Sequence, residues 1–357
     1  MTAVIETKRF DTGSLRLARH GLSVRRSGSG WCLATPDGEI AVASAADEVP
    51  PELSSLVLAF TRGEELVAVD GREATADEPR FDGSARGVVL AYLHGQIQEI
   101  TFADISVRQA EPGSAARMAL AVHRVRDVLG AYATVLGGRK LVRLVRRELS
   151  WLAACLDALG EAETQWDRLA GRVRALPERF VVGPVEPLVD RYFGSLTREC
   201  RARVGESLAG KRYLRLLYGL DLLRMVLIEE PRSARSESVN RPAGEVLPGL
   251  VAELDRKATR RIAKAASGTD DREHAMSKAG AATDRLCHAA EVAGMVPSVR
   301  PAVVASLREH KAAVAARLHL RAIEAFALGQ RLSVFTFGLL YQLETEAFER
   351  SIVDMRL

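Results

Sequence analysis

Apolar side chains recur every three to four residues over most of the chain, from about residue 86 to the C-terminal end. This spacing places apolar residues on one side of an α-helix and polar residues on the other. The pattern therefore predicts a mainly α-helical protein in which each helix buries one side. The expected helices lie near residues 87–106, 114–136, 139–158, 162–174, 184–209, 212–228, 245–266, 271–294, 299–329 and 334–350.

The first 80 residues follow a different pattern, with short apolar or alternating runs between turns that contain Gly and Pro. Runs of this length predict strands, and closely spaced turns favour antiparallel pairing. We therefore expect a small antiparallel β-meander with strands at 21–25, 31–34 and 39–43. It should be followed by a short helix over 53–62, a strand over 66–69 and a polar linker over 75–84.

Two halves are expected within the helical part. The segment 229–244 contains Pro231, Pro242 and three serines, a composition typical of a flexible connector. It separates residues 83–230 from residues 243–357, and each half holds several helices with a long basic-faced hairpin near its beginning. We interpret this arrangement as an old duplication whose copies have diverged beyond visible sequence identity.

Composition favours an ordered protein that does not span a membrane. Of the 357 residues, 47% are hydrophobic and only 5% are aromatic, so we expect a core of aliphatic side chains. No apolar run approaches the ~20 residues that a membrane span needs, and the first nine residues lack the apolar stretch of a signal peptide. We therefore expect a soluble, cytoplasmic protein without a membrane partner.

The four cysteines and seven histidines are dispersed, and none stands at the spacing of a zinc site. We therefore predict reduced thiols, no metal and no cofactor. Catalysis would need paired carboxylates or a nucleophile with its base, and no such combination emerges. We predict no catalytic residues and expect that the protein is not an enzyme.

Three predicted helical segments carry cations on one side and apolar residues on the other. Cations on an outer helix face usually serve solvation, and the net charge is only +4. The acidic residues cluster elsewhere along the chain, however, and this segregation favours a polyanionic ligand. The cations are Arg139, Lys140, Arg143, Arg146 and Arg147 in the first segment, Lys257, Arg260, Arg261 and Lys264 in the second, and His274, Lys278, Arg285 and His288 in the third.

Several short segments of the helical part share a register with a known family. They are 111–113 (EPG) leading into 118–126 (MALAVHRVR), 148–154 (ELSWLAA), 208–217 (LAGKRYLRLL), 285–291 (RLCHAAE) and 335–341 (FTFGLLY). Together they resemble the CHAD domain, the conserved histidine α-helical domain, over about residues 83–357. The resemblance implies two antiparallel helical bundles with pseudo-twofold symmetry, whose basic residues line a groove that binds inorganic polyphosphate. An association with polyphosphate granules would follow from that ligand.

The basic segments and the resemblance together define the candidate binding residues. Rows of Arg and Lys at one-turn spacing suit a linear ligand with one negative charge per repeat. We predict that inorganic polyphosphate, or another polyanion, is bound by His123, Arg124, Arg126, Lys140, Arg143, Arg147, Arg212, Lys257, Arg260, Arg261, Lys264, His274, Lys278, Arg285 and His288.

The first half departs from the CHAD pattern. Ala116 and Ala119 stand where the family has a His and an Arg, and the usual double arginine is replaced by His123 and Arg124. Two alternatives therefore stay open: a protein-interaction scaffold whose phosphate site has decayed, and a protein that binds single-stranded nucleic acid. Nucleic acid is less favoured, because the basic segments hold almost no aromatic side chains for base stacking.

In the second half of the helical part, His274, Lys278 and Arg285 stand at places comparable to the CHAD family pattern.

The N-terminal residues indicate a second module. Residues 10–26 (FDTGSLRLARHGLSVRR), with Gly30-Trp31, 49–53 and 61–63, resemble the middle of a CYTH domain, the triphosphate tunnel fold that often precedes CHAD. The family's E-x-E-x-K strand is missing, and Ala34 replaces a lysine. We expect residues 1–80 to be a truncated, catalytically inactive β-rich (α+β) segment of CYTH type. Its exposed sheet residues should include Arg16, Arg19, Arg25 and Arg26.

Overall fold

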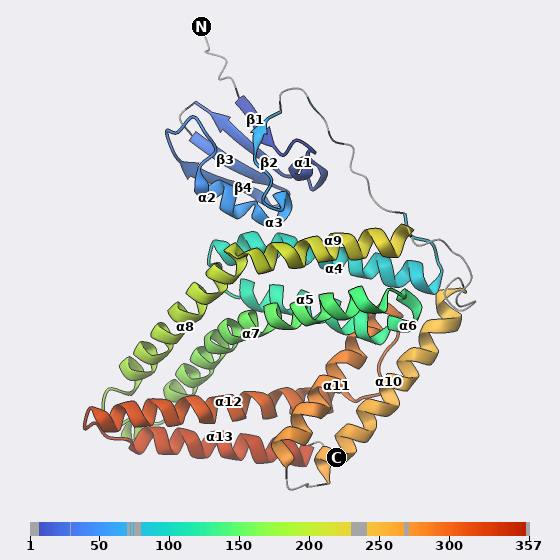
Figure 1. The fold of residues 1–357 in the computed structure, drawn as a ribbon. Helices are drawn as coiled ribbons and strands as arrows, with labels where there is room; N and C mark the ends of the chain where they lie inside the picture. Colours follow the sequence, from blue (N-terminus) through green and yellow to red (C-terminus); the bar gives the residue numbers. More distant parts are fainter. Residues whose placement is uncertain are drawn as a thin grey trace.

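The chain folds into a small N-terminal module with a β-sheet and a larger assembly of helices (Figure 1). The computed structural model describes residues 7–28, 30–69, 72, 74, 80–229, 241–267 and 271–354. Half of the expected linker, residues 75–79, and most of the expected connector between the halves, residues 230–240, lie outside the described residues. The predicted fold class, mainly α-helical with a small antiparallel sheet, is confirmed.

Five antiparallel strands form the sheet in the order β4-β3-β2-β1-β5. The predicted meander corresponds to β2, β3 and β4, whereas the first strand is missing from the prediction because its residues, TKRFD, are mostly polar and do not alternate. The strands are β1 (Thr7–Asp11), β2 (Ser23–Ser27), β3 (Gly30–Thr35), β4 (Gly38–Ala43) and β5 (Val67–Ala68).

A buried carboxylate, that of Asp11, turns the chain from β1 into the short helix α1 (Arg16–Arg19). It accepts hydrogen bonds from the backbone N–H groups of Leu17 and Ala18, both at 2.9 Å. These bonds satisfy N–H groups that the start of a helix leaves unpaired. Arg16 and Arg19 therefore lie in a helix, and the expectation that they are sheet residues is wrong.

Two short helices, α2 (Pro51–Leu56) and α3 (Leu58–Thr61), lie against one face of the sheet, where a single helix is predicted (Figure 1). The apolar cluster beneath them contains Trp31 of β3 and Phe60 of α3. It also contains Ile105, which belongs to the first long helix of the helical assembly. The N-terminal module and the helices are thus joined by a shared core.

The helices of the larger assembly follow the predicted apolar periodicity closely, with two differences: the predicted helix 114–136 is divided into α5 and α6, and the predicted helices 139–158 and 162–174 form one helix, α7. They are α4 (Ala85–Arg108), α5 (Ser114–Ala131), α6 (Ala133–Leu136), α7 (Arg139–Ala175), the 3-10 turn η1 (Glu178–Phe180), α8 (Val185–Ala209), α9 (Lys211–Glu229), α10 (Ala243–Ala266), α11 (Arg272–Val292), α12 (Pro301–Gly329) and α13 (Phe335–Asp354).

Helix α7 is continuous where two helices, 139–158 and 162–174, are predicted. Gly160, at the expected break, lies against Ala116 of α5, and a Cβ at the glycine would be 3.6 Å from the Cβ of Ala116. Two small residues thus let α5 and α7 approach each other closely. This tertiary contact outweighs the low helix propensity of glycine.

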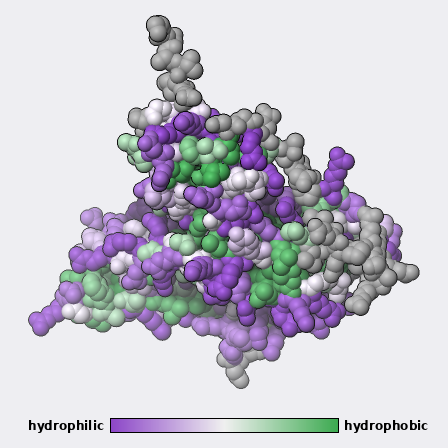
Figure 2. Space-filling view, turned by 45° about the horizontal axis from the view of Figure 1, so that its top comes forward, coloured by the Kyte–Doolittle hydropathy of each residue, from purple (hydrophilic) through white to green (hydrophobic). Residues whose placement is uncertain are grey.

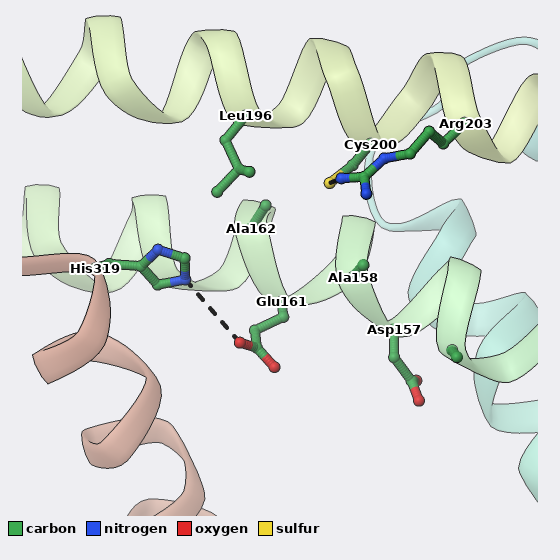
Figure 3. A pocket seen from close by; sticks show the side chains of 9 residues that line it. Asp157, Ala158, Glu161, Ala162, Leu196, Cys200, Arg203 and His319 are labelled. Atoms are coloured by element: carbon green, nitrogen blue, oxygen red, sulfur yellow. Dashed lines mark hydrogen bonds and ion pairs between the residues drawn. The ribbon is translucent and has the colours of Figure 1, made fainter. Parts of the chain in front are cut away.

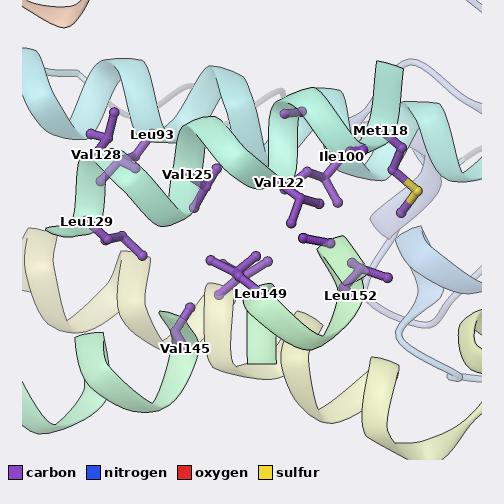
Figure 4. Packing of buried hydrophobic residues seen from close by; sticks show 14 of the residues in the cluster. Leu93, Ile100, Met118, Val122, Val125, Val128, Leu129, Val145, Leu149 and Leu152 are labelled. Atoms are coloured by element: carbon purple, nitrogen blue, oxygen red, sulfur yellow. The ribbon is translucent and has the colours of Figure 1, made fainter. Parts of the chain in front are cut away.

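Two main apolar clusters fill the helical assembly. The larger lies between α4, α5, α7, α9, α10 and α11, and Figure 4 shows Val125 of α5 and Leu149 of α7 within it. The second joins the C-terminal part of α7 to α8, α12 and α13 around Phe193 and Phe337. The 37 residues of α7 extend about 55 Å, which allows one helix to take part in both clusters.

The starts of α4 and α10 lie side by side although they are far apart in the sequence (Figure 1). The N–H group of Ala85 donates to the carbonyl of Arg241 at 2.9 Å, and that of Ala243 donates to the carbonyl of Gly83 at 3.1 Å. This short antiparallel bridge joins the beginnings of the two helical halves.

A buried ion pair fixes the N-terminal module on α9. The guanidinium group of Arg62, whose side chain is 6% exposed, donates two hydrogen bonds of 2.9 Å to the carboxylate of Asp221. Tyr218 of α9 donates from its hydroxyl to the carbonyl of Arg62 at 3.1 Å. Because the guanidinium group of Arg62 is removed from water, it depends on the partly exposed carboxylate of Asp221 for its stabilisation.

Replacement of Asp221 by Ala should destabilise the protein, because the Arg62 guanidinium would stay buried without its counter-ion. We expect a loss of about 2–3 kcal/mol in the free energy of unfolding, measured by urea denaturation. Asp167→Ala removes an exposed carboxylate of α7 and is the matched control. A change for Asp221→Ala no larger than that of the control would contradict the assignment.

The buried imidazole of His310 should make stability depend on pH. Its Nδ1 lies 3.3 Å from Ser351 Oγ, and burial, with Arg317 nearby, lowers its pKa from 6.5 to about 4. The unfolded chain therefore binds a proton more readily than the folded one. The contribution of the neutral imidazole to stability is complete above pH 6.5 and is lost as the pH falls towards 4.

Unfolding free energies at pH 7 and pH 5 should differ by about 2 kcal/mol on account of His310. His310→Gln should reduce this difference, and His274→Gln, at an exposed position of α11, should leave it unchanged. An equal pH dependence in all three proteins would show that His310 is not responsible.

Candidate functional site

Three helices, α5, α7 and α11, meet beside the larger apolar cluster. Tyr132, which directly follows α5, donates from its hydroxyl to the carbonyl of Ala289 in α11 at 2.7 Å. Burial raises the pKa of this hydroxyl well above its ordinary value, so it remains a donor. The bond fixes the C-terminal end of α5 against α11.

The carboxylate of Asp127 on α5 lies at the centre of this junction and is 1% exposed. It accepts from Arg126 Nε at 3.1 Å and Nη2 at 3.0 Å, and its other oxygen lies 3.1 Å from His288 Nδ1 of α11. Arg285 Nε, also of α11, is 4.0 Å away. Burial alone would raise the pKa of Asp127, but the hydrogen bond from His288 and the charge of Arg126 hold it below its ordinary value. Asp127 is therefore ionised.

Arg146 of α7 brings a further cation to the same place. Its Nε donates to the carbonyl of Arg126 at 3.1 Å. Its guanidinium group packs on Gly130, where a Cβ would be 2.7 Å from Nη2. Burial and the charge of Arg285 lower the pKa of Arg146, as expected of a cation held near other cations. We call Arg126, Arg146, Arg285 and His288, with Asp127, the junction cluster.

Two other candidates on α5 are paired with carboxylates. His123 Nε2 lies 2.9 Å from an oxygen of Asp157 on α7. Arg124 Nη2 lies 3.3 Å from Glu291 on α11. Both pairs bridge α5 to a neighbouring helix, and both are partly exposed, so each cation is partly neutralised where it stands.

A basic row continues from the junction cluster along α11. The candidates His274, Lys278, Arg285 and His288 share one side of this helix, since their spacings are close to whole turns. Arg261 of α10 reaches the same row, with Nη1 donating to the carbonyl of Lys278 at 3.3 Å. The basic surface therefore extends along this row from the junction of α5, α7 and α11 towards α10.

Several candidates are exposed and have no carboxylate partner among the residues that the structure describes. Arg143 precedes Arg146 by one turn of α7 and lies on the same side of that helix. Arg260 bonds only to a carbonyl of its own helix, through Nε at 3.3 Å from the oxygen of Arg256. The exposed candidates without such a partner are Lys140, Arg143, Lys257, Arg260, Lys264, His274 and Lys278.

The structure does not bring Arg147 and Arg212 to the junction cluster. Both donate to Glu148, Arg147 at 3.1 Å and Arg212 at 2.6 Å. Arg212 also lies over the ring of Trp151, with 4.3 Å between the guanidinium carbon and the ring centroid. Residues two apart on a helix point to nearly opposite sides, so Glu148 and Arg146 face away from each other. The two arginines thus belong to a separate ion pair between α7 and α9.

A shallow pocket of about 370 Å³ lies between α7, α8 and α12 (Figure 3). Its lining includes Asp157 and Glu161 of α7, Arg203 of α8 and His319 of α12. His319 Nε2 is 4.0 Å from Glu161, and burial lowers the pKa of this imidazole. Opposite charges line the pocket together, so its lining lacks the single sign of charge that a polyanion requires.

Within the described residues, no group of three or more His, Cys, Asp or Glu side chains could hold a metal ion. The described helices also include none that is long and apolar enough to cross a membrane. In keeping with this, hydrophilic side chains surround smaller hydrophobic patches on the face seen in Figure 2.

Residues 91–322 match the family model of the CHAD domain. The chain therefore belongs to the CHAD domain family, as the short segments at helical register predict. The matched residues cover the junction cluster and the basic row but not the sheet. The CYTH-like character of residues 1–80 stays a prediction.

The chain is similar to two curated proteins, the uncharacterized proteins MT2285 and Rv2226 of two Mycobacterium tuberculosis strains, with 27% identity over 303 residues. The match covers 81% of this chain and 55% of each relative, so the chain spans about half their length.

Two solved structures share the fold. PptA from Streptomyces chartreusis superimposes with a TM-score of 0.61 at 15% identity, over 76% of this chain and 98% of that chain. The CHAD domain of the plant Ricinus communis superimposes with a TM-score of 0.55 at 17% identity, over 78% of this chain and 95% of that chain.

Proposed function

We propose that this chain binds inorganic polyphosphate, without catalysing a reaction, through the junction cluster and the basic row of α11 and α10. The observation that carries the proposal is the convergence of Arg126, Arg146 and Arg285 from three helices around one buried carboxylate. Three guanidinium groups and one carboxylate leave an excess of positive charge. Guanidinium forks bind phosphate oxygens in pairs, which suits a chain of phosphoryl groups.

The surroundings of the cluster support a ligand without bases. Single-stranded nucleic acid is usually held by aromatic side chains that stack on the bases. The aromatic ring paired with a candidate cation is that of Trp151, and it lies under Arg212, outside the junction cluster. CHAD membership is consistent with the same ligand class.

The affinity for polyphosphate should fall as the salt concentration rises and should depend on the basic row of α11 and α10. We expect the triple variant Arg143→Glu, Lys257→Glu and Lys278→Glu to bind polyphosphate at least about tenfold more weakly, because it reverses one exposed charge of the row and two exposed charges one helical turn from Arg146 and Arg261. The control triple Arg191→Glu, Arg198→Glu and Arg215→Glu changes the net charge equally, at exposed positions of α8 and α9. Fluorescence titrations at about 50 and 200 mM salt would measure both.

Equal weakening in the two triple variants would reject the site. Tighter binding of oligodeoxythymidylate than of polyphosphate at matched charge would favour nucleic acid instead. If the unaltered chain binds neither polymer at low salt, the proposed function is wrong, and the interaction scaffold is the better hypothesis. Circular dichroism establishes that each variant keeps its helices.

Gly130→Ala should weaken polyphosphate binding without loss of stability. A Cβ at this position would displace the Arg146 guanidinium group, since it would lie 2.7 Å from Nη2. Alanine also favours a helix over glycine by about 0.5–1 kcal/mol, so the fold should not suffer. Gly171→Ala is the matched control, because nothing lies within 4 Å of the Cβ added there. Unchanged affinity for Gly130→Ala would show that Arg146 does not contact the ligand.

A further inference from the structure

Asp127 lies beneath the cations of the junction cluster, further from solvent than they are. Its side chain is 2% exposed, whereas those of Arg126 and Arg285 are 27% and 30% exposed. A dissolved polyanion can therefore reach the guanidinium groups but not the carboxylate. Asp127 does not occupy the place of a ligand; it supports the groups that would hold one.

Arg126 and Arg146 are held by hydrogen bonds, whereas Arg285 is attracted to the carboxylate by charge alone. Arg126 uses Nε and Nη2 on Asp127, at 3.1 and 3.0 Å, and Arg146 uses Nε on the carbonyl of Arg126 at 3.1 Å. Arg285 Nε lies 4.0 Å from Asp127, too far for a hydrogen bond, and has no other hydrogen-bond partner in the described part of the chain. Among the described residues, Nη1 of Arg126 and both Nη atoms of Arg285 have no hydrogen-bond acceptor. The outer ends of these forks are available to an anion.

The carboxylate also joins elements that are distant in sequence. Arg126 belongs to α5, and its partner across the carboxylate, His288, belongs to α11, at 3.1 Å from Asp127. One buried charge thereby sets the distance between cations of the two helical halves. Preorganised donors bind their ligand without the cost of ordering flexible side chains.

We infer that Asp127 is a positioning residue that determines the specificity of the polyphosphate site, an inference that rests on the proposed function. It fixes Arg126 and His288 by hydrogen bonds and attracts Arg285 by charge, which leaves Nη1 of Arg126 and both Nη atoms of Arg285 for phosphoryl oxygens. A fixed set of forks distinguishes the closely spaced phosphoryl groups of polyphosphate from the more widely spaced phosphates of a nucleic acid. An unordered set of cations would bind both by charge alone.

Removal of a negative charge alone would have a different effect. It would strengthen the attraction for every polyanion by the same factor, because the Coulomb interaction does not depend on the ligand's chemistry. Loss of the positioning of the arginines would weaken the binding of polyphosphate relative to the binding of nucleic acid. The ratio of the two affinities therefore separates the two effects.

Asp127→Asn tests the inference, with titrations of polyphosphate and of oligodeoxythymidylate of equal charge. We expect the ratio of the affinities to fall about tenfold, since a neutral amide has one oxygen instead of two for Arg126 and His288 and no longer attracts Arg285 by charge. Asp167→Asn removes the same charge at an exposed position of α7 and should leave the ratio unchanged.

A second variant, Asp127→Glu, keeps the charge and moves the carboxylate by one methylene group. We expect it to lower the same ratio, and it keeps the test open if the amide variant does not fold. An unchanged ratio in the folded Asp127 variants would overturn the inference while polyphosphate binding by the unaltered chain still stands. Absence of that binding would instead refute the proposed function.

Discussion

The buried carboxylate of Asp127 constrains the arrangement of the helices around it. An ionised group that is 1% exposed must be neutralised, and the cations that do so come from its own helix and from α11. Helix α11 docks on α5 where His288 lies 3.1 Å from one oxygen of this carboxylate and Arg285 lies 4.0 Å from the other. Arg146 of α7 is positioned next to this carboxylate because its Nε donates a hydrogen bond to the backbone carbonyl of Arg126 in α5. The basic side chains thus gather at this junction because one buried negative charge must be neutralised.

The same rule holds at the other boundaries between packed elements. Glu344 of α13 is fully buried and accepts from Arg168 and Arg172 of α7, which joins the second apolar cluster. Asp221 joins the N-terminal module to α9 through Arg62. The cores themselves are aliphatic and nondirectional, so they tolerate several packings. Paired buried charges have narrow geometric requirements, and they give each boundary a definite register.

The sequence was sufficient to predict the helices because apolar periodicity is a local property. Two local signals also misled. The periodicity predicted a break between residues 158 and 162, although contact of Gly160 with Ala116 of α5 keeps α7 continuous. The run TKRFD lacks strand alternation, yet it pairs with β2 and β5. In both cases the deciding partner lies in another element.

The sequence periodicity predicted which basic residues share a helix face, but it could not predict which acidic or backbone group each of them bonds to. Arg146 and Arg147 are neighbours in the sequence, yet one faces α5 and α11 while the other bonds to Glu148. Asp127 has no distinguishing local signal, since its partner His288 is 161 positions away. A carboxylate in a basic segment is usually interpreted as simple charge compensation. Here its burial gives it a different role: it binds Arg126 and His288 by hydrogen bonds and attracts Arg285, so a negative charge orders the basic side chains around it.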